Sequence, residues 1–141
     1  QLMRRVNSQY SVYRSGTWCY LIDVQRGVVA VECPLTQRKR LGQTVFHPEF
    51  TRTNMRYRGQ GLAVRLYRAL VQSGVQLVSG DSQSVGSRKL WGKLCASRGV
   101  TVWAYLRGVW SQCELDPVTG YADCDWDIYA STATVLFATR G

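Results

Sequence analysis

The chain has 141 residues, a net charge of +9 and an ordinary apolar content of 45%. This length suits one domain that buries roughly two-thirds of its unfolded surface. No apolar run approaches the ~20 residues that a membrane-spanning helix needs, and nothing at the start resembles a signal peptide. We therefore expect a single domain over residues 1–141, cytoplasmic and without a membrane partner.

The basic excess is mostly arginine, with 15 Arg against 3 Lys. It is also uneven, because residues 1–113 hold 17 basic against 4 acidic residues, whereas residues 114–141 hold 1 against 5. Arginine forms paired hydrogen bonds with phosphate. We therefore expect a phosphate-bearing or acidic partner: a cofactor's phosphates, a nucleic acid or an acidic protein. A solvated basic face is the alternative.

Cysteine spacing argues against a metal site. The five cysteines are Cys19, Cys33, Cys95, Cys113 and Cys124. No two form a Cys-x-x-Cys pair and the chain has one histidine, so we expect no bound metal. The first three lie in apolar runs and are expected in the core. The last two flank a turn and could meet across a hairpin, but we favour reduced thiols.

We expect mainly β-strands in the first third of the chain. Residues 1–16 are polar and weakly patterned, and we interpret them as a frayed remnant of helices. Thr17–Val24 and Val28–Cys33 are rich in β-branched and aromatic residues and are predicted strands. Pro34 closes the second one, since proline cannot donate to a ladder. The basic segment Gln37–Arg40 is then expected to be a solvated hairpin tip.

A strand, a helix and another strand follow. Leu41–Phe50 is the next predicted strand. Leu62–Val71 is a predicted amphipathic helix whose apolar residues share one face while Arg65 and Arg68 share the other. Val75–Ser79 is a short apolar strand. This order predicts a crossover that joins neighbouring parallel strands.

The remaining predicted elements become weaker toward the C-terminus. They are a helix over Ser84–Cys95 capped by Ser84 or Ser87, a strand over Val100–Tyr105, a loosely patterned stretch over 106–127 and a last strand over Thr132–Thr139.

The most informative segment is Arg58-Gly59-Gln60-Gly61-Leu62-Ala63, which opens the first helix. Glycines at a helix start leave backbone N–H groups unpaired and let a ligand approach the main chain. Those N–H groups and the helix dipole favour a phosphate or pyrophosphate, and Arg58 adds a charged fork. The plain alternative is a tight turn that caps a helix.

The flanking segments give this loop a family resemblance. A strand-like run ends in His47-Pro48-Glu49-Phe50 upstream, and the helix and strand described above follow downstream. This order resembles the GCN5-related N-acetyltransferase (GNAT) superfamily, whose coenzyme-A loop reads Arg/Gln-x-x-Gly-x-Gly/Ala. Arg58, Gly61 and Ala63 fill its three defining positions, although Thr51–Tyr57 is an insertion before the loop.

The resemblance implies a mixed α+β fold, with a mostly antiparallel GNAT-like sheet that splays after the fourth strand and is flanked by helices. The expected core spans about residues 17–106, with a C-terminal hairpin over about 107–141. It also implies an enzyme that moves an acetyl group from acetyl-CoA to an amine by direct attack. The expected cofactor-binding residues are Val45, Phe46, His47, Arg58, Gly59, Gln60, Gly61, Leu62, Ala63 and Ser84.

Catalytic groups match the family less well. Related enzymes often carry a tyrosine acid on the helix after the fifth strand, where this chain has Trp91, which we expect to pack in the core or against the cofactor. Tyr105 or Tyr67 could replace the missing acid, and the spacing selects neither. The candidates for the base are His47, Glu49, Glu32 and Asp81. Imidazole exchanges protons most readily near neutral pH.

The insertion Thr51–Tyr57 has little to bury and is expected to project near the mouth where the acceptor amine meets the thioester. Arg52 and Arg56 on it would favour an acidic or phosphate-bearing acceptor over a polyamine. Surface decoration is the alternative.

Three functions stay open. The first is the acyl-CoA-dependent N-acyltransferase. The second is a catalytically silent GNAT-like binding or structural protein of a virus or mobile element, for which the compact size and missing tyrosine argue. The third is a tRNA-directed acetyltransferase toxin, favoured by the arginine excess. A homodimer is compatible with each of them.

Overall fold

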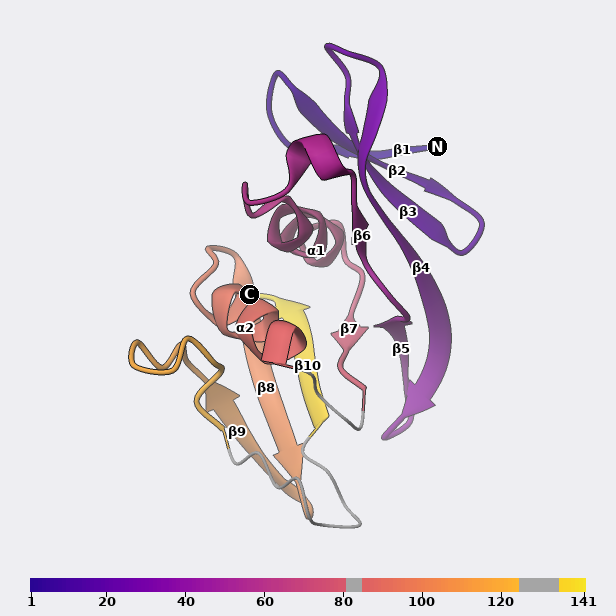
Figure 1. Ribbon diagram of the computed structural model, residues 1–141. Coiled ribbons are helices and arrows are strands. Elements are labelled where there is room, and N and C mark those ends of the chain that lie inside the picture. Colours follow the sequence, from indigo (N-terminus) through magenta and orange to yellow (C-terminus); the bar gives the residue numbers. More distant parts are fainter. Residues whose placement is uncertain (81–84, 125–134) are drawn as a thin grey trace.

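The computed structural model describes residues 1–80, 85–124 and 135–141 of the chain. In these residues one ten-stranded sheet carries two α-helices (Figure 1). The strands are β1 (Leu2–Arg5), β2 (Tyr10–Ser15), β3 (Trp18–Asp23), β4 (Val28–Arg40), β5 (Gln43–Pro48), β6 (Arg52–Thr53), β7 (Leu77–Val78), β8 (Val100–Leu106), β9 (Val109–Cys113) and β10 (Val135–Arg140). The helices are α1 (Leu62–Gln72) and α2 (Val85–Cys95), with a 3-10 turn η1 (Met55–Tyr57).

The sheet order is β1-β2-β3-β4-β5-β7-β10-β8-β9, with β6 pairing beside β4. Neighbouring strands in the described chain run antiparallel, except that β5 and β7 are parallel and pair through Phe46 and Leu77. α1 connects these two strands, so the predicted crossover between parallel neighbours is confirmed. The strands β9 and β10 are not neighbours, because β8 lies between them.

The expected GNAT-like α+β fold, with helices flanking the sheet, is wrong. The described chain is mostly one mixed sheet of ten strands, and its two α-helices are short, with 11 residues each. The difference begins in residues 1–16, where strands β1 and β2 replace the expected helical remnant. Tyr10 and Val12 are buried there, and β2 pairs with β3 from Tyr10 opposite Asp23 to Ser15 opposite Trp18.

Strand β4 continues through Pro34, so the expected strand end and the solvated tip at Gln37–Arg40 are wrong. The amide of Leu35 donates to the carbonyl of Thr17 on the β3 side, and the nitrogen of Pro34 therefore points to the other edge. On that edge β6 pairs only as far as Glu32, and the pairing with β5 ends where Pro48 lies opposite Leu35. The missing N–H of Pro34 thus falls in the gap between two partner strands.

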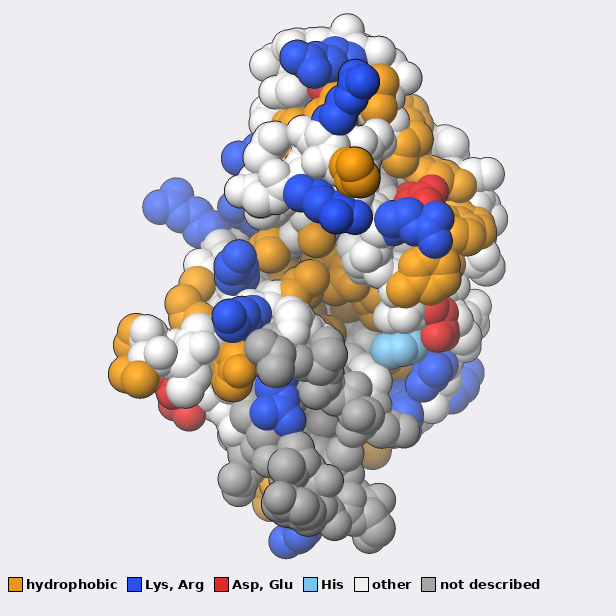
Figure 2. Space-filling view, viewed as in Figure 1, with side chains coloured by type: hydrophobic (Ala, Val, Ile, Leu, Met, Phe, Trp, Pro, Cys, Tyr) orange, Lys and Arg blue, Asp and Glu red, His pale blue; other side chains and the backbone are white. Residues whose placement is uncertain are grey.

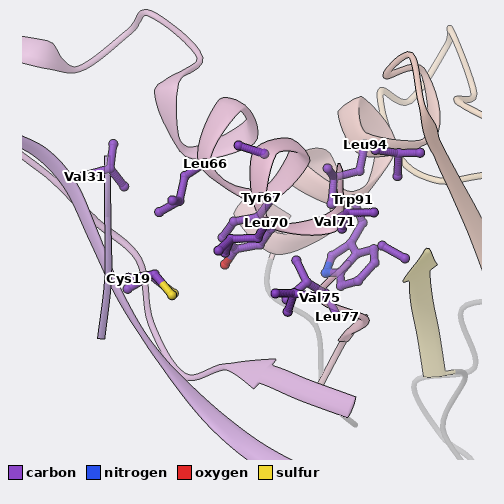
Figure 3. Packing of buried hydrophobic residues seen from close by; sticks show 14 of the residues in the cluster. Cys19, Val31, Leu66, Tyr67, Leu70, Val71, Val75, Leu77, Trp91 and Leu94 are labelled. Carbon is purple, nitrogen blue, oxygen red and sulfur yellow. The ribbon is translucent and has the colours of Figure 1, made fainter. Parts of the chain in front are cut away.

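The main core lies between the sheet and the two helices (Figure 3). Leu66 and Leu70 of α1 are fully buried, as the amphipathic pattern predicted, and α2 contributes Trp91 and Leu94. A smaller cluster consists of Val45, Val78 and Phe137. Two exposed tryptophans, Trp103 and Trp110, border an open groove beside Phe137.

The cysteines are free thiols. Cys19 and Cys33 are fully buried, as predicted, and Cys95 is half-buried at the edge of the core. Cys113 and Cys124 do lie together. A hydrogen bond from Cys124 lowers the pKa of the Cys113 thiol.

The insertion Thr51–Tyr57 does not project from the surface as expected. Its strand β6 pairs with β4, and Tyr57 is 5% exposed in the core. The Tyr57 hydroxyl donates to Asp23 Oδ2 over 2.7 Å, while the Asn54 side chain accepts from the amide of Arg56. Tyr57 therefore anchors a segment whose composition indicated nothing to bury.

Ser84 and Asp81 lie outside the described residues, as do the first three residues of the strand expected over Thr132–Thr139. Neither described helix has the length and apolar character that a bilayer-crossing helix requires.

Candidate active site where two parallel strands separate

The site begins at the single pairing between β5 and β7. The amide of Phe46 donates to the carbonyl of Gln76 over 2.9 Å. In a regular parallel ladder the next donor from β5 would be the amide of residue 48, and its acceptor would be the carbonyl of Val78. Residue 48 is proline, which has no N–H. The ladder therefore ends at Phe46, and the two strands pair no further.

The His47 side chain takes the place of the missing amide. Its Nδ1 lies 3.2 Å from the carbonyl oxygen of Val78. A carbonyl only accepts, so Nδ1 carries the hydrogen, and the neutral ring then presents a free lone pair at Nε2. The hydrogen bond to Val78 thus sets both the orientation of the imidazole ring and its tautomer. A general base needs a ring nitrogen that is held in place with its lone pair free, as Nε2 is here.

A cavity of about 250 Å³ occupies this region. Its lining residues are His47, Pro48, Glu49, Phe50, Thr51, Tyr67, Val78, Ser79, Gly80, Ser87, Leu90 and Trp91. Figure 2 shows the surface hollowed near the centre of the view, with the histidine in pale blue at the border of the hollow. This volume is below the roughly 300–1,000 Å³ of most small-molecule sites.

Glu49 lies beside His47 in the lining. A hydrogen bond from Thr36, with smaller contributions from the charges of His47 and Arg38, holds the pKa of the Glu49 carboxyl below its usual range. The guanidinium of Arg38 is 3.7 Å from Glu49 Oε1. Glu49 is therefore a carboxylate at neutral pH and a weak base.

Tyr67 supplies a hydroxyl from α1. Its oxygen is 2.6 Å from Thr51 Oγ1, and Thr51 Oγ1 is 3.5 Å from Cys33 Sγ. Burial raises the pKa of Tyr67 well above that of a free phenol and also raises the pKa of Cys33. Both groups stay protonated near neutral pH. Tyr67 can then act as a hydrogen-bond donor, and Cys33 is not a nucleophile.

The glycine loop forms the start of α1. Gly59 and Gly61 adopt left-handed conformations, with φ of +79° and +70°, and a Cβ added to either would meet no atom within 4 Å. The first turn holds no acidic residue and no side chain caps it. In the described chain, the amides of residues 59–64 have no acceptor, since the first bond of the helix is from Arg65 to Gly61. This open row of N–H donors fits an anion.

The expected site residues are only partly brought together. His47 and Glu49 share the cavity, whereas Tyr105 packs against Trp110 with ring centroids 5.0 Å apart and does not line it. Val45 is fully buried in the smaller cluster, and the amide of Phe46 is used by the sheet.

The six loop residues Arg58–Ala63 lie together at the start of α1, as the motif predicted. Ser84 is outside the described residues. Arg52 forms an ion pair with Glu32 at 3.4 Å, and its guanidinium lies over Phe50. Arg56 is exposed on η1.

Sequence reasoning missed Thr51 and Ser79, and it left Tyr67 undecided. Thr51 was hidden in a segment that looked like a surface loop. Ser79 ends the β7–β10 ladder by exchanging hydrogen bonds with Leu136, so its position follows from a pairing that is distant in sequence. The sequence did contain a reason to prefer Tyr67 as a site residue, because Tyr67 lies five residues into the helix that opens with the glycine loop.

Comparison with known proteins does not assign the chain to a family. No family model, no curated protein and no solved structure matches this chain. Its function is therefore argued from the geometry of the site alone.

Proposed function

We propose that the chain is an acyl-CoA-dependent N-acyltransferase, with the acyl transfer taking place in the cavity beside His47. The observation that carries this proposal is the position of α1. Its first turn presents the unpaired amides of residues 59–64, and Tyr67, five residues further along, lines the cavity. At ~1.5 Å per residue the two features lie roughly 8 Å apart along the helix axis.

The glycine loop would hold the phosphates of the coenzyme. The N–H groups of residues 59–64 and the positive end of the α1 dipole favour a pyrophosphate, and the absence of any acidic residue from the first turn removes a competing charge. Arg58 is exposed at the entrance to the loop and would add a charge-assisted contact.

The cavity residues would handle the protons. Bound acetyl-CoA supplies an acyl thioester for attack by an amine. His47 Nε2 would take the proton from that amine, since Nδ1 is engaged with Val78. Glu49 would stabilise the resulting imidazolium, and the neutral hydroxyl of Tyr67 would turn from Thr51 to donate a hydrogen bond to the sulfur, which leaves as the thiolate.

The proposal is tested by following thiol release from acetyl-CoA in the presence of amine pools: amino acids, peptides, polyamines and nucleotide-linked amines. We expect one pool to accelerate release above hydrolysis, and His47→Gln to abolish that acceleration. If acetyl-CoA binds but no pool accelerates thiol release, the catalytically silent binding protein becomes the better account. If the His47→Gln variant keeps the full rate, His47 is not the base.

A further inference from the structure

A second cavity, of about 380 Å³, lies between β1 and α1. Its lining residues are Arg4, Arg5, Val6, Asn7, Arg65, Arg68, Ala69 and Gln72, and we call it the arginine cleft. It shares no lining residue with the cavity beside His47. Nothing in the proposed acyl transfer uses it.

Two elements bring the four arginines together. The pairing of β1 with β2 shifts between Leu2 and Arg4, which places Arg4 opposite Val12, a residue buried on the sheet face that carries α1. Arg65 and Arg68 are three residues apart on α1, so their Cβ atoms lie about 5–6 Å apart on one face. All four arginines line the same hollow, two from β1 and two from α1.

None of the described residues that line this cleft carries a carboxylate. In the described part of residues 1–113, Asp23 bonds to Tyr57, Glu32 pairs with Arg52 and Glu49 pairs with Arg38. Like charges held together repel one another, and an anion in the hollow relieves that repulsion. The basic side chains in Figure 2 likewise outnumber the acidic ones on the face in view.

The cleft is partly preorganised for an anion. Arg68 Nε donates to the carbonyl of Arg98 over 3.0 Å, and Gln72 Nε2 donates to the same oxygen over 3.1 Å. This leaves the terminal nitrogens of Arg68 for another acceptor. Guanidinium groups match the geometry of phosphate oxygens, and one already held in place loses less side-chain freedom on binding.

We propose that the arginine cleft binds the phosphate backbone of a nucleic acid strand. Four cations on two separate elements exceed what a single phosphate needs, whereas successive phosphates of a strand would engage them in turn. Within the described part of the chain, the lining contains no aromatic ring on which a base could stack and no carboxylate that could read a base edge. Binding is therefore independent of base sequence and falls with rising salt.

The test measures anisotropy of fluorescein-labelled single-stranded RNA, and of DNA of the same sequence, at about 50 mM and about 200 mM salt. The cleft variant is Arg65→Glu with Arg68→Glu. Its matched control is Arg26→Glu with Lys39→Glu. Both residues are exposed and lie outside the cleft, and the two substitutions change the net charge by the same amount as the cleft variant. We expect the cleft variant to lose about tenfold or more in affinity and to show a salt slope smaller by roughly 1–2, with the control close to wild type.

A second variant, Arg4→Glu with Arg5→Glu, changes the edge strand and leaves α1 intact, so a folding failure of the first variant does not end the test. Equal losses in the control and cleft variants would overturn the proposal, because the effect would then belong to net charge. Displacement of the RNA by coenzyme A would also overturn it by assigning the cleft to the cofactor. Acetyl-CoA affinity, measured in parallel, should be unchanged in the Arg4→Glu with Arg5→Glu variant and in the control, which leave the first turn of α1 as it is, so the two proposals fail separately.

Discussion

The imidazole of His47 bonds to the carbonyl oxygen of Val78 at 3.2 Å, where the amide of Pro48 would stand if that residue had one. The proline stops the parallel ladder and the histidine satisfies the acceptor that the ladder leaves free. Two adjacent residues thus end the ladder beside the cavity and orient the imidazole that lines it.

Replacing Pro48 by alanine restores an N–H at the point where the strands separate. We expect this amide to bond to Val78, displace His47 and narrow the cavity, so that acetyl-CoA binds several-fold more weakly. Hydrogen exchange by NMR should show a protected amide at residue 48. The control is Pro117→Ala in an exposed turn, which has the same effect on the unfolded chain. A freely exchanging amide at residue 48 would mean that the proline is not what separates the strands.

The His47→Gln variant separates catalysis from binding. Glutamine can still donate to Val78 but cannot take a proton, so we expect kcat with the best amine to fall by about 100-fold or more. Acetyl-CoA affinity should stay within about twofold of wild type, because the expected phosphate contacts lie on α1. An equal rise in the dissociation constant would instead show that His47 acts by shaping the cofactor site.

The buried pair of Tyr57 and Asp23 makes stability depend on pH. The hydrogen bond from Tyr57 lowers the pKa of Asp23 and raises the pKa of Tyr57. The contribution of Asp23 is thus present above its ordinary pKa of about 3.9 and is lost as pH falls through the lower folded value, whereas that of Tyr57 is lost as pH rises above about 10.

We expect Tyr57→Phe to lower the urea midpoint at about pH 6 and to flatten its decline below about pH 4. Tyr20→Phe is the control, since Tyr20 is a half-exposed tyrosine in the same sheet. If the urea midpoint of Tyr57→Phe falls as steeply below about pH 4 as that of the wild type, the assigned role of the pair is contradicted.

Arg58→Ala tests the entrance of the glycine loop. A lost charge-assisted contact should weaken acetyl-CoA binding by about 1–3 kcal/mol, without a matching loss of thermal stability. Arg56→Ala, on the preceding turn η1, is the control and should spare the affinity. A fall in melting temperature at unchanged affinity would make Arg58 a structural residue.

The sequence correctly predicted the features that depend on neighbouring residues, namely α1 and the glycine loop at its start. The period of Leu66 and Leu70 located α1, and the two glycines located its open start, because both signals lie within a few residues. Of the four candidate bases named from the sequence, His47 and Glu49 line the cavity. Pro34 misled because the consequence of its missing N–H depends on which strands flank β4, and this is set by distant pairings.

The same limit explains the error in fold class. Residues 1–16 form two strands since β3 offers an edge to β2, which no local propensity reveals. Tyr57 appeared to belong to a polar loop, yet its partner Asp23 lies 34 residues earlier in the chain. Tyr105 seemed as good a catalytic candidate as Tyr67, and only the packing of α1 against the cavity distinguishes them.

Calorimetric titration of acetyl-CoA into the wild type, Gly61→Val and Gly27→Val tests the central claim most directly. Both glycines have positive φ and open surroundings, so both substitutions strain the backbone alike, but Gly27 lies in the turn between β3 and β4. We expect the wild type and Gly27→Val to bind and Gly61→Val to lose binding. No heat of binding for the wild type at millimolar acetyl-CoA, or equal affinity for Gly61→Val, would contradict the account.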